Sequence, residues 1–224
     1  MNRPLSQLIY ARIQDMPSSP RIVTLHKHNQ YAADVKDYAF AASPNARIIG
    51  LESYKGVFVG KEIVGYTWFI GPQQAPSPIF FGDALAEIER FLWDEIDRQE
   101  TPSAELPFLI GVEQGAIMAL AAAAAVPDLI SGVIAVDASL PVVPGWEPPL
   151  APLANLPVLL IEDPARPAHE SVLTGERLAD TFTAWGADVT RATVQDASNT
   201  VPAEIMSRWM SAREPRILQV DSID

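Results

Sequence analysis

The stretch Pro107-Phe-Leu-Ile-Gly-Val-Glu-Gln-Gly-Ala116 decides the fold of this chain. Its first half is a run of apolar residues, as in a strand that is buried on both faces of a sheet. Its second half opens a helix that we predict over 114–126. Gly111 and Gly115 stand two residues to either side of Glu113. This spacing indicates a tight strand-to-helix turn that projects its central side chain outward.

Strand and helix patterns alternate along most of the chain. Short apolar or β-branched runs predict strands at 8–13, 21–25, 47–51, 107–112, 132–137, 157–161 and 188–194. Apolar residues three to four positions apart predict helices at 33–42, 83–99, 114–126, 171–185 and 202–212. The alternation predicts one α/β domain over 1–224, with a mostly parallel sheet, helices on both faces and an antiparallel first strand at the edge.

Two segments fall outside this alternation. The proline-rich segment 141–157 is a candidate lid loop, although a surface connection is the simpler interpretation. Residues 213–224 are expected to form a tail.

The composition limits the chemistry and the partners. The 224 residues include 16 Lys and Arg against 28 Asp and Glu, which gives a net charge of −12 and argues against nucleic acid and anionic membranes as partners. There is no cysteine, so disulfides and a thiolate nucleophile are excluded. The three histidines are His26, His28 and His169. We see neither a secretory signal nor an apolar run long enough to span a bilayer, and we expect a cytoplasmic protein.

In a parallel sheet, ligands bind beyond the carboxyl ends of the strands. Many residues at this edge carry carboxylates; the candidates are His26, Lys27, His28, Glu52, Glu113, Asp137, Glu162, Asp163 and 196–199. An acidic edge of this kind would repel anions. We therefore expect any small ligand to be neutral or cationic. Tyr66, Trp68 and Trp146 are the candidates to line its pocket, although each of them taken alone is more typical of a core residue.

The chain resembles the carboxylesterase/phospholipase branch of the α/β-hydrolase superfamily over about 21–210. The segments that carry the resemblance are Leu25-His26, Pro44-Asn45-Ala46-Arg47, Gly65-Tyr66-Thr67-Trp68-Phe69, Gly111-Val112-Glu113-Gln114-Gly115-Ala116, Leu156-Pro157-Val158, Asp163-Pro164, Gly186-Ala187-Asp188-Val189 and Asn199-Thr200-Val201. The resemblance implies the α/β-hydrolase fold. It also implies a nucleophile, an acid and a base at Glu113, Asp163 and Asn199, where the family has Ser, an acid and His.

Two of these three positions carry the wrong residue type for serine hydrolysis. Glu113 replaces the nucleophilic Ser, and the amide of Asn199 cannot act as a general base. The resemblance places an oxyanion hole at the backbone of Gln114 and of the turn Lys27-His28, where the family has glycines. We therefore expect no Ser-His-Asp catalysis, no cofactor and no metal, and we expect a non-catalytic binding or regulatory protein.

Other interpretations stay open. Glu113 could itself be a nucleophile toward small esters if one of the three histidines supplied the base. His26, His28, Glu113 and Asp163 are also permissible metal ligands. A third class is a structural or interaction protein, which an exposed apolar patch would favour.

The simplest interpretation of Glu113 is an ion pair at the helix N-terminus with Lys27 or Arg166. The sequence leaves the oligomeric state open, a homodimer included.

Overall fold

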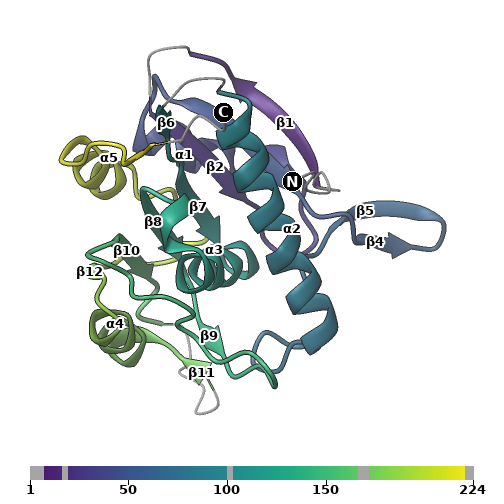
Figure 1. Cartoon of the computed structure of the whole chain (residues 1–224). Helices are drawn as coiled ribbons and strands as arrows, with labels where there is room; N and C mark the ends of the chain where they lie inside the picture. Colours follow the sequence, from purple (N-terminus) through teal and green to yellow (C-terminus); the bar gives the residue numbers. More distant parts are fainter. Residues whose placement is uncertain (1–7, 17–19, 100–102, 166–171, 220–224) are drawn as a thin grey trace, which may run out of the picture.

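A seven-stranded sheet forms the centre of the computed structural model, which describes residues 8–16, 20–99, 103–165 and 172–219 (Figure 1). The strand order is β1-β3-β2-β7-β8-β10-β12. The bounds are β1 (Ile9–Gln14), β2 (Arg21–Leu25), β3 (Arg47–Glu52), β7 (Phe108–Val112), β8 (Gly132–Val136), β10 (Pro157–Glu162) and β12 (Asp188–Thr193). All neighbours pair in parallel except β1, which runs antiparallel to β3 at the edge. The predicted sheet and its antiparallel edge are confirmed.

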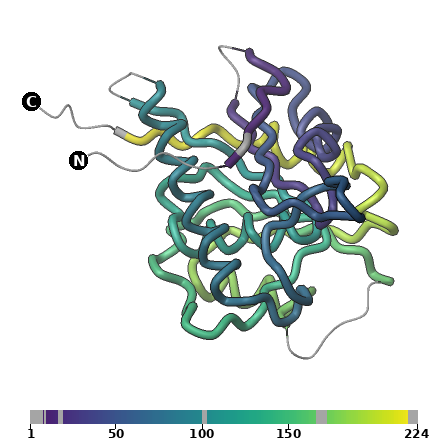
Figure 2. Tube along the Cα trace, turned by 90° about the vertical axis from the view of Figure 1, so that its right-hand side faces the viewer, coloured from purple at the N-terminus to yellow at the C-terminus, as the bar shows by residue number. Residues whose placement is uncertain are grey.

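Helices cover both faces of the sheet, which is why β7 and β8 are apolar and buried along their whole length. One face carries α2 (Pro78–Asp97), α3 (Gln114–Ala125) and α4 (Gly175–Ala184). The other carries α1 (Lys36–Ala42), preceded by the 3₁₀ turn η1 (Ala32–Val35), and α5 (Ala203–Ser211). Figure 2 shows the sheet between these layers, with α2 on the left and α1 on the right. A second 3₁₀ turn, η2 (Pro127–Leu129), follows α3.

Three two-stranded ribbons in the described residues are additions to the predicted elements. They are β4 (Gly56–Val59) with β5 (Glu62–Tyr66), β9 (Leu140–Pro141) with β11 (Val172–Leu173), and β6 (Ser103–Glu105) with β13 (Ile217–Gln219). The expected helix over 171–185 is accordingly too long. Val172 and Leu173 belong to a strand, α4 begins at Gly175, and residue 171 lies outside the described residues.

The expected tail at 213–224 is wrong for the residues that the structure describes there. Strand β13 pairs antiparallel with β6. The Arg216 side chain donates to the carbonyl oxygens of Pro127 and Ile130, at 2.9 and 3.1 Å. These contacts attach 213–219 to the domain, and residues 220–224 lie outside the described part.

The proline-rich segment 141–157 is a packed connection. Val143, Leu153 and Leu156 are buried in the core. The Leu150 N–H donates to the Ala124 carbonyl near the C-terminal end of α3, whereas Glu113 stands at the N-terminal end of this helix. The segment therefore passes the end of α3 that lies away from Glu113. This path agrees with a surface connection better than with a lid over the elbow.

In the part of the chain that the structure describes, no helix is both long enough and apolar enough to cross a membrane.

Candidate active site at the carboxyl edge of the sheet

The elbow between β7 and α3 requires both of its glycines. A Cβ on Gly111 would lie 2.3 Å from the Gly115 carbonyl oxygen, and a Cβ on Gly115 would lie 2.1 Å from the Leu25 carbonyl oxygen. Glu113, between them, has φ 50° and ψ −110°. A residue other than glycine costs about 1–3 kcal/mol in such a conformation, so the surrounding contacts must impose it. The turn predicted from the spacing of the glycines is present.

Glu113 has a cation beside it. The Lys27 Nζ lies 3.9 Å from the Glu113 Oε1, with the two side chains 12% and 30% exposed. The same ammonium donates to the Asn199 Oδ1 at 3.1 Å, and the Asn199 amide donates to the Asp196 Oδ1 at 2.7 Å. Lys27 therefore joins the elbow to the loop that carries Asn199. The expected Glu113–Lys27 ion pair is present, and Arg166 lies outside the described residues.

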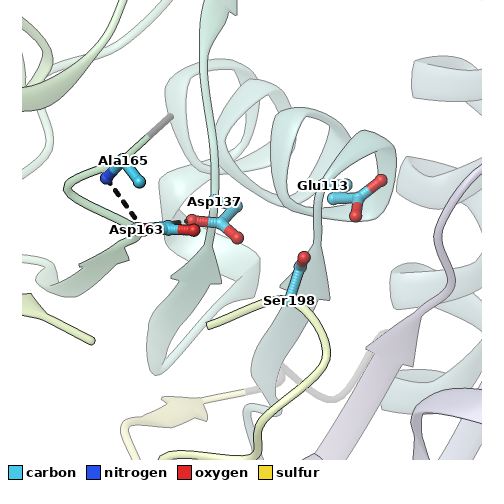
Figure 3. Close-up of a pocket in the computed structure, with 5 residues that line it drawn as sticks. All are labelled: Glu113, Asp137, Asp163, Ala165 and Ser198. Atoms are coloured by element: carbon cyan, nitrogen blue, oxygen red, sulfur yellow. Dashed lines mark hydrogen bonds between the residues drawn. The ribbon is translucent and has the colours of Figure 1, made fainter. Parts of the chain in front are cut away.

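A cavity of about 310 Å³ opens beside the elbow (Figure 3). The residues that line it come from four strand ends and loops; they are Glu113, Asp137, Asp163, Ala165 and Ser198. In Figure 3 the Ser198 hydroxyl points toward the space between Asp137 and Glu113. Three acidic residues thus line one cavity, and in Figure 3 the Glu113 carboxylate is turned away from the two aspartates.

Asp163 is held by Asp137. The Asp163 N–H donates to the Asp137 Oδ1 at 2.7 Å, and the Asp163 Oδ1 accepts from the Ala165 N–H at 2.9 Å. Asp137 is 4% exposed, so its carboxylate forms the floor of the cavity. Glu162, the preceding residue, instead forms an ion pair with Arg191 at 3.3 Å. Asp163 therefore lines the same cavity as Glu113, whereas the Glu162 carboxylate pairs with Arg191 on β12.

Tyr38 on α1 is hydrogen-bonded to the loop at 196–200. Its hydroxyl donates to the Ala197 carbonyl at 3.1 Å, and the Ala197 side chain is buried. Burial, and then the negative charges of Asp137, Glu113 and Asp196, raise the pKa of Tyr38 to about 12. The hydroxyl consequently keeps its proton and remains a donor. Sequence reasoning missed this residue because nothing in its local pattern links α1 to a loop more than a hundred residues away.

His26 is a structural residue. Its Nε2 accepts from the Ser53 N–H at 3.2 Å, so the proton must be on Nδ1, which donates to the Lys27 carbonyl at 2.6 Å. The ring is fully buried and stacks on Trp68 at 4.9 Å between centroids. Burial lowers the pKa of His26 to about 4, although the hydrogen bond to Lys27 acts in the opposite direction. A neutral ring with both nitrogens occupied has no free lone pair for catalysis.

His28 does not stand beside Glu113 as a base in the described structure. His28 is exposed, and its Nδ1 lies 3.0 Å from the Thr67 Oγ1. Within the described ranges, no hydrogen bond or ion pair joins a histidine to Glu113. His169 lies in 166–171, outside the described residues.

Gln114 turns its side chain away from the cavity. Its Oε1 accepts from the Trp68 N–H at 2.8 Å and lies 2.9 Å from the Thr67 Oγ1, and its Nε2 donates to the Phe69 carbonyl at 3.1 Å. The buried amide thereby ties the segment after β5 to the start of α3. Its expected role in an oxyanion hole concerns the backbone N–H alone, and that role stays a prediction.

The three aromatic residues expected around a pocket lie elsewhere. Trp68 is fully buried, and its Nε1 donates to the His26 carbonyl at 2.9 Å. Trp146 packs against Phe81 at 5.1 Å, and Tyr66 packs edge-on against Tyr31 at 5.8 Å. The prediction of an aromatic lining is therefore wrong for the cavity beside Glu113, which is lined by carboxylates and small residues.

The described side chains do not gather a metal site. No group of three or more His, Cys, Asp or Glu among them is arranged to hold an ion. For the set His26, His28, Glu113 and Asp163, the physical reason is that both nitrogens of His26 are already hydrogen-bonded within the turn.

Comparison with known proteins identifies the fold. No family model matches the chain, and no curated protein matches it in sequence. Among solved structures, a carboxylesterase of Bacillus cereus superposes with a TM-score of 0.70 and 18% identity, over 92% of this chain and 94% of its own. The chain has the α/β-hydrolase fold.

Other structures with this fold agree. A carboxylesterase of Mesorhizobium loti matches with a TM-score of 0.68 and 18% identity, covering 88% of this chain and 90% of its own. A phospholipase/carboxylesterase of Dyadobacter fermentans matches with a TM-score of 0.64 and 17% identity, covering 94% and 99%. At identities this low, the likeness to these structures establishes the fold alone.

Proposed function

We propose that this protein is a non-catalytic binding or regulatory homologue of the esterases with this fold, and that its acidic cavity takes a small cationic ligand. The observation that carries the proposal is the contact network of Asn199. Asn199 stands where the resemblance to the esterases implies the catalytic base, and its amide is bonded to Lys27 and Asp196. An amide cannot take up a proton at neutral pH, so a nucleophile at this elbow would have no base.

The lining of the cavity supports a cationic ligand. Asp137, Asp163 and Glu113 line it, and the Lys27 ammonium lies beside Glu113. The negative charges of these residues would attract a cation that enters the cavity and would repel an anion. A neutral ligand would gain the hydrogen bonds without the charge attraction and should bind more weakly. The cytoplasmic location expected from the sequence remains part of this proposal.

Hydrolysis of small esters by Glu113 as nucleophile is the alternative. It needs an activated water to release the covalent ester, and hence a base beside Glu113. The Lys27 ammonium lies beside the Glu113 carboxylate, where this base would have to stand. An ammonium donates hydrogen bonds and accepts none. The geometry of the described residues therefore favours binding over turnover.

Calorimetric titration with a matched pair of probes tests the binding. We expect putrescine to bind and 1,4-butanediol, a diol of the same chain length without the charges, to bind at least about tenfold more weakly. Glu113→Gln should weaken putrescine binding, since it removes one carboxylate charge from the cavity. Glu147→Gln, at an exposed position outside the cavity, removes the same net charge and should leave binding unchanged.

Equal affinity for the two probes would contradict a cationic ligand. Equal loss of putrescine affinity in Glu113→Gln and Glu147→Gln would show that only the overall charge matters, and would contradict the assignment of the site.

A further inference from the structure

Lys27 is held beside the cavity by a series of side-chain contacts. The Asn199 Nδ2 donates to the Asp196 Oδ1 at 2.7 Å, and this contact turns the Asn199 Oδ1 toward Lys27. The Lys27 Nζ donates to this oxygen at 3.1 Å and lies 3.9 Å from the Glu113 Oε1. The Lys27 side chain is 12% exposed, so solvent and salt screen its charge only weakly. A fixed positive charge of the protein therefore stands beside Glu113.

The acidic lining of the cavity has two parts. In Figure 3 the Glu113 carboxylate is turned away from Asp137 and Asp163, and the Lys27 ammonium lies beside it. The two aspartates are joined to each other, because the Asp163 N–H donates to the Asp137 Oδ1 at 2.7 Å. The described residues that line the cavity include neither Lys nor Arg. One carboxylate is thus paired with a cation of the protein, and the other two line the space that a ligand would enter.

We propose, on the basis of the proposed function of the cavity, that Lys27 determines the charge of the ligand. The Lys27 ammonium fills the cation position beside Glu113. The cavity therefore takes a ligand with a single positive charge, seated beside Asp137 and Asp163, and with an uncharged remainder. A second positive charge on the ligand would be attracted by Glu113 and repelled by Lys27 to a similar degree, so it would add little affinity.

The lining also selects the kind of cation. A primary ammonium has three N–H groups, which can donate to the aspartate carboxylates and to the Ser198 hydroxyl; in Figure 3 this hydroxyl points toward the space between Asp137 and Glu113. A quaternary ammonium has no N–H, and proteins bind it with aromatic rings. No aromatic residue is among the described residues that line this cavity. The ligand class is therefore a primary monoamine with an uncharged remainder, such as an amino alcohol.

Calorimetric titration of the native protein with 4-amino-1-butanol and putrescine tests the charge of the ligand. The two molecules have the same chain length and differ by one charge at neutral pH. We expect their affinities to agree within about threefold, of which the two equivalent ends of putrescine account for about twofold. The N,N,N-trimethyl derivative of 4-amino-1-butanol should bind at least about tenfold more weakly than the primary amine, since it cannot donate a hydrogen bond.

Lys27→Met removes the fixed charge and should remove the preference for a single charge. We expect the ratio of the putrescine affinity to the 4-amino-1-butanol affinity to rise at least about fivefold, since only the diamine brings a second charge to Glu113. Lys27→Arg retains the charge and should retain the native ratio. The ratio does not depend on the folded fraction of a variant, which lowers both apparent affinities equally.

Lys61→Met is the matched control for the overall charge. It removes the same charge at an exposed position that does not line the cavity, and it should leave the native ratio unchanged.

The possible outcomes separate this proposal from the proposed function. A native protein that binds putrescine more than about threefold more tightly than 4-amino-1-butanol would overturn the role of Lys27 and retain the cationic site. An unchanged ratio in Lys27→Met, or an equal rise of the ratio in Lys61→Met, would also overturn it. Equal binding of the trimethyl derivative and the primary amine would overturn the assignment of the ligand class. If neither amine binds more tightly than 1,4-butanediol, the proposed function fails and the role of Lys27 fails with it.

Discussion

His26 is held uncharged beneath the turn that precedes the elbow. In the unfolded chain a histidine takes up its proton near pH 6.5, whereas the pKa of the folded His26 is lowered to about 4, chiefly by burial. Between these values the unfolded state binds more protons than the folded state. His26 therefore lowers the stability of the folded protein as the pH falls from about 6.5 toward about 4.

We predict that this residue alone lowers the free energy of unfolding by about 2 kcal/mol between pH 7.5 and pH 5. Urea unfolding at the two pH values measures the drop. His26→Gln cannot titrate, and its stability should fall by about 2 kcal/mol less over the same range. An equal fall in native protein and variant would mean that His26 is not the group responsible.

At the scale of residues, the sequence predicted contacts that follow from chain order in a parallel sheet. The turn after β2 lies beside the end of β7, because these strands are neighbours, and this brings Lys27 to Glu113. The burial of Trp68 agrees with the core position that its residue type favours, but its contacts were not predictable in this way. It depends on a ring stacked on His26 and on an indole N–H bonded to the His26 carbonyl, and neither contact leaves a periodic signal in the sequence.

Helix α3 packs directly against β2 at the elbow, and Gly115 is the point of contact. A Cβ at this position would lie 2.1 Å from the Leu25 carbonyl oxygen. The atom it meets belongs to the backbone of a central strand, so helix and strand would have to move apart. On the exposed side of α2, a Cβ added to Gly82 would meet nothing within 4 Å.

We predict that Gly115→Ala lowers the free energy of unfolding by about 3 kcal/mol, since overpacking against backbone cannot be relieved by a rotamer change. Gly82→Ala should raise it by about 0.5–1 kcal/mol, because alanine favours the helix. Urea denaturation of both variants against native protein gives the comparison. A Gly115→Ala protein as stable as the native one would be inconsistent with the close approach of α3 to β2.

At the scale of elements, long periodic segments were predictable and short ribbons were not. Strands such as β7 and β10 have apolar sequences because helices bury both of their faces. The ribbon of β6 and β13 has three residues in each strand, and its pairing joins positions more than a hundred residues apart. No local pattern predicts such a pair, and the last residues therefore looked like a tail.

For the whole molecule, the alternation of strands and helices was sufficient to predict the architecture, and the strand order placed the acidic residues at one edge. Part of the excess negative charge of the chain is therefore located at this edge of the sheet. Asp137, Asp163 and Glu113 come from three neighbouring strands and face a single cavity. The lining itself was predicted wrongly, because the side chains that fill space near the elbow depend on packing between distant segments.

The proposed function requires that this site, which has Asn199 where the resemblance implies a base, does not hydrolyse esters. The direct measurement is the hydrolysis of 4-nitrophenyl acetate and butyrate by native protein and by Glu113→Ala, at neutral pH. We predict that both proteins release nitrophenol no faster than buffer. Saturable turnover by the native protein that disappears in Glu113→Ala would contradict the account and make Glu113 a catalytic residue.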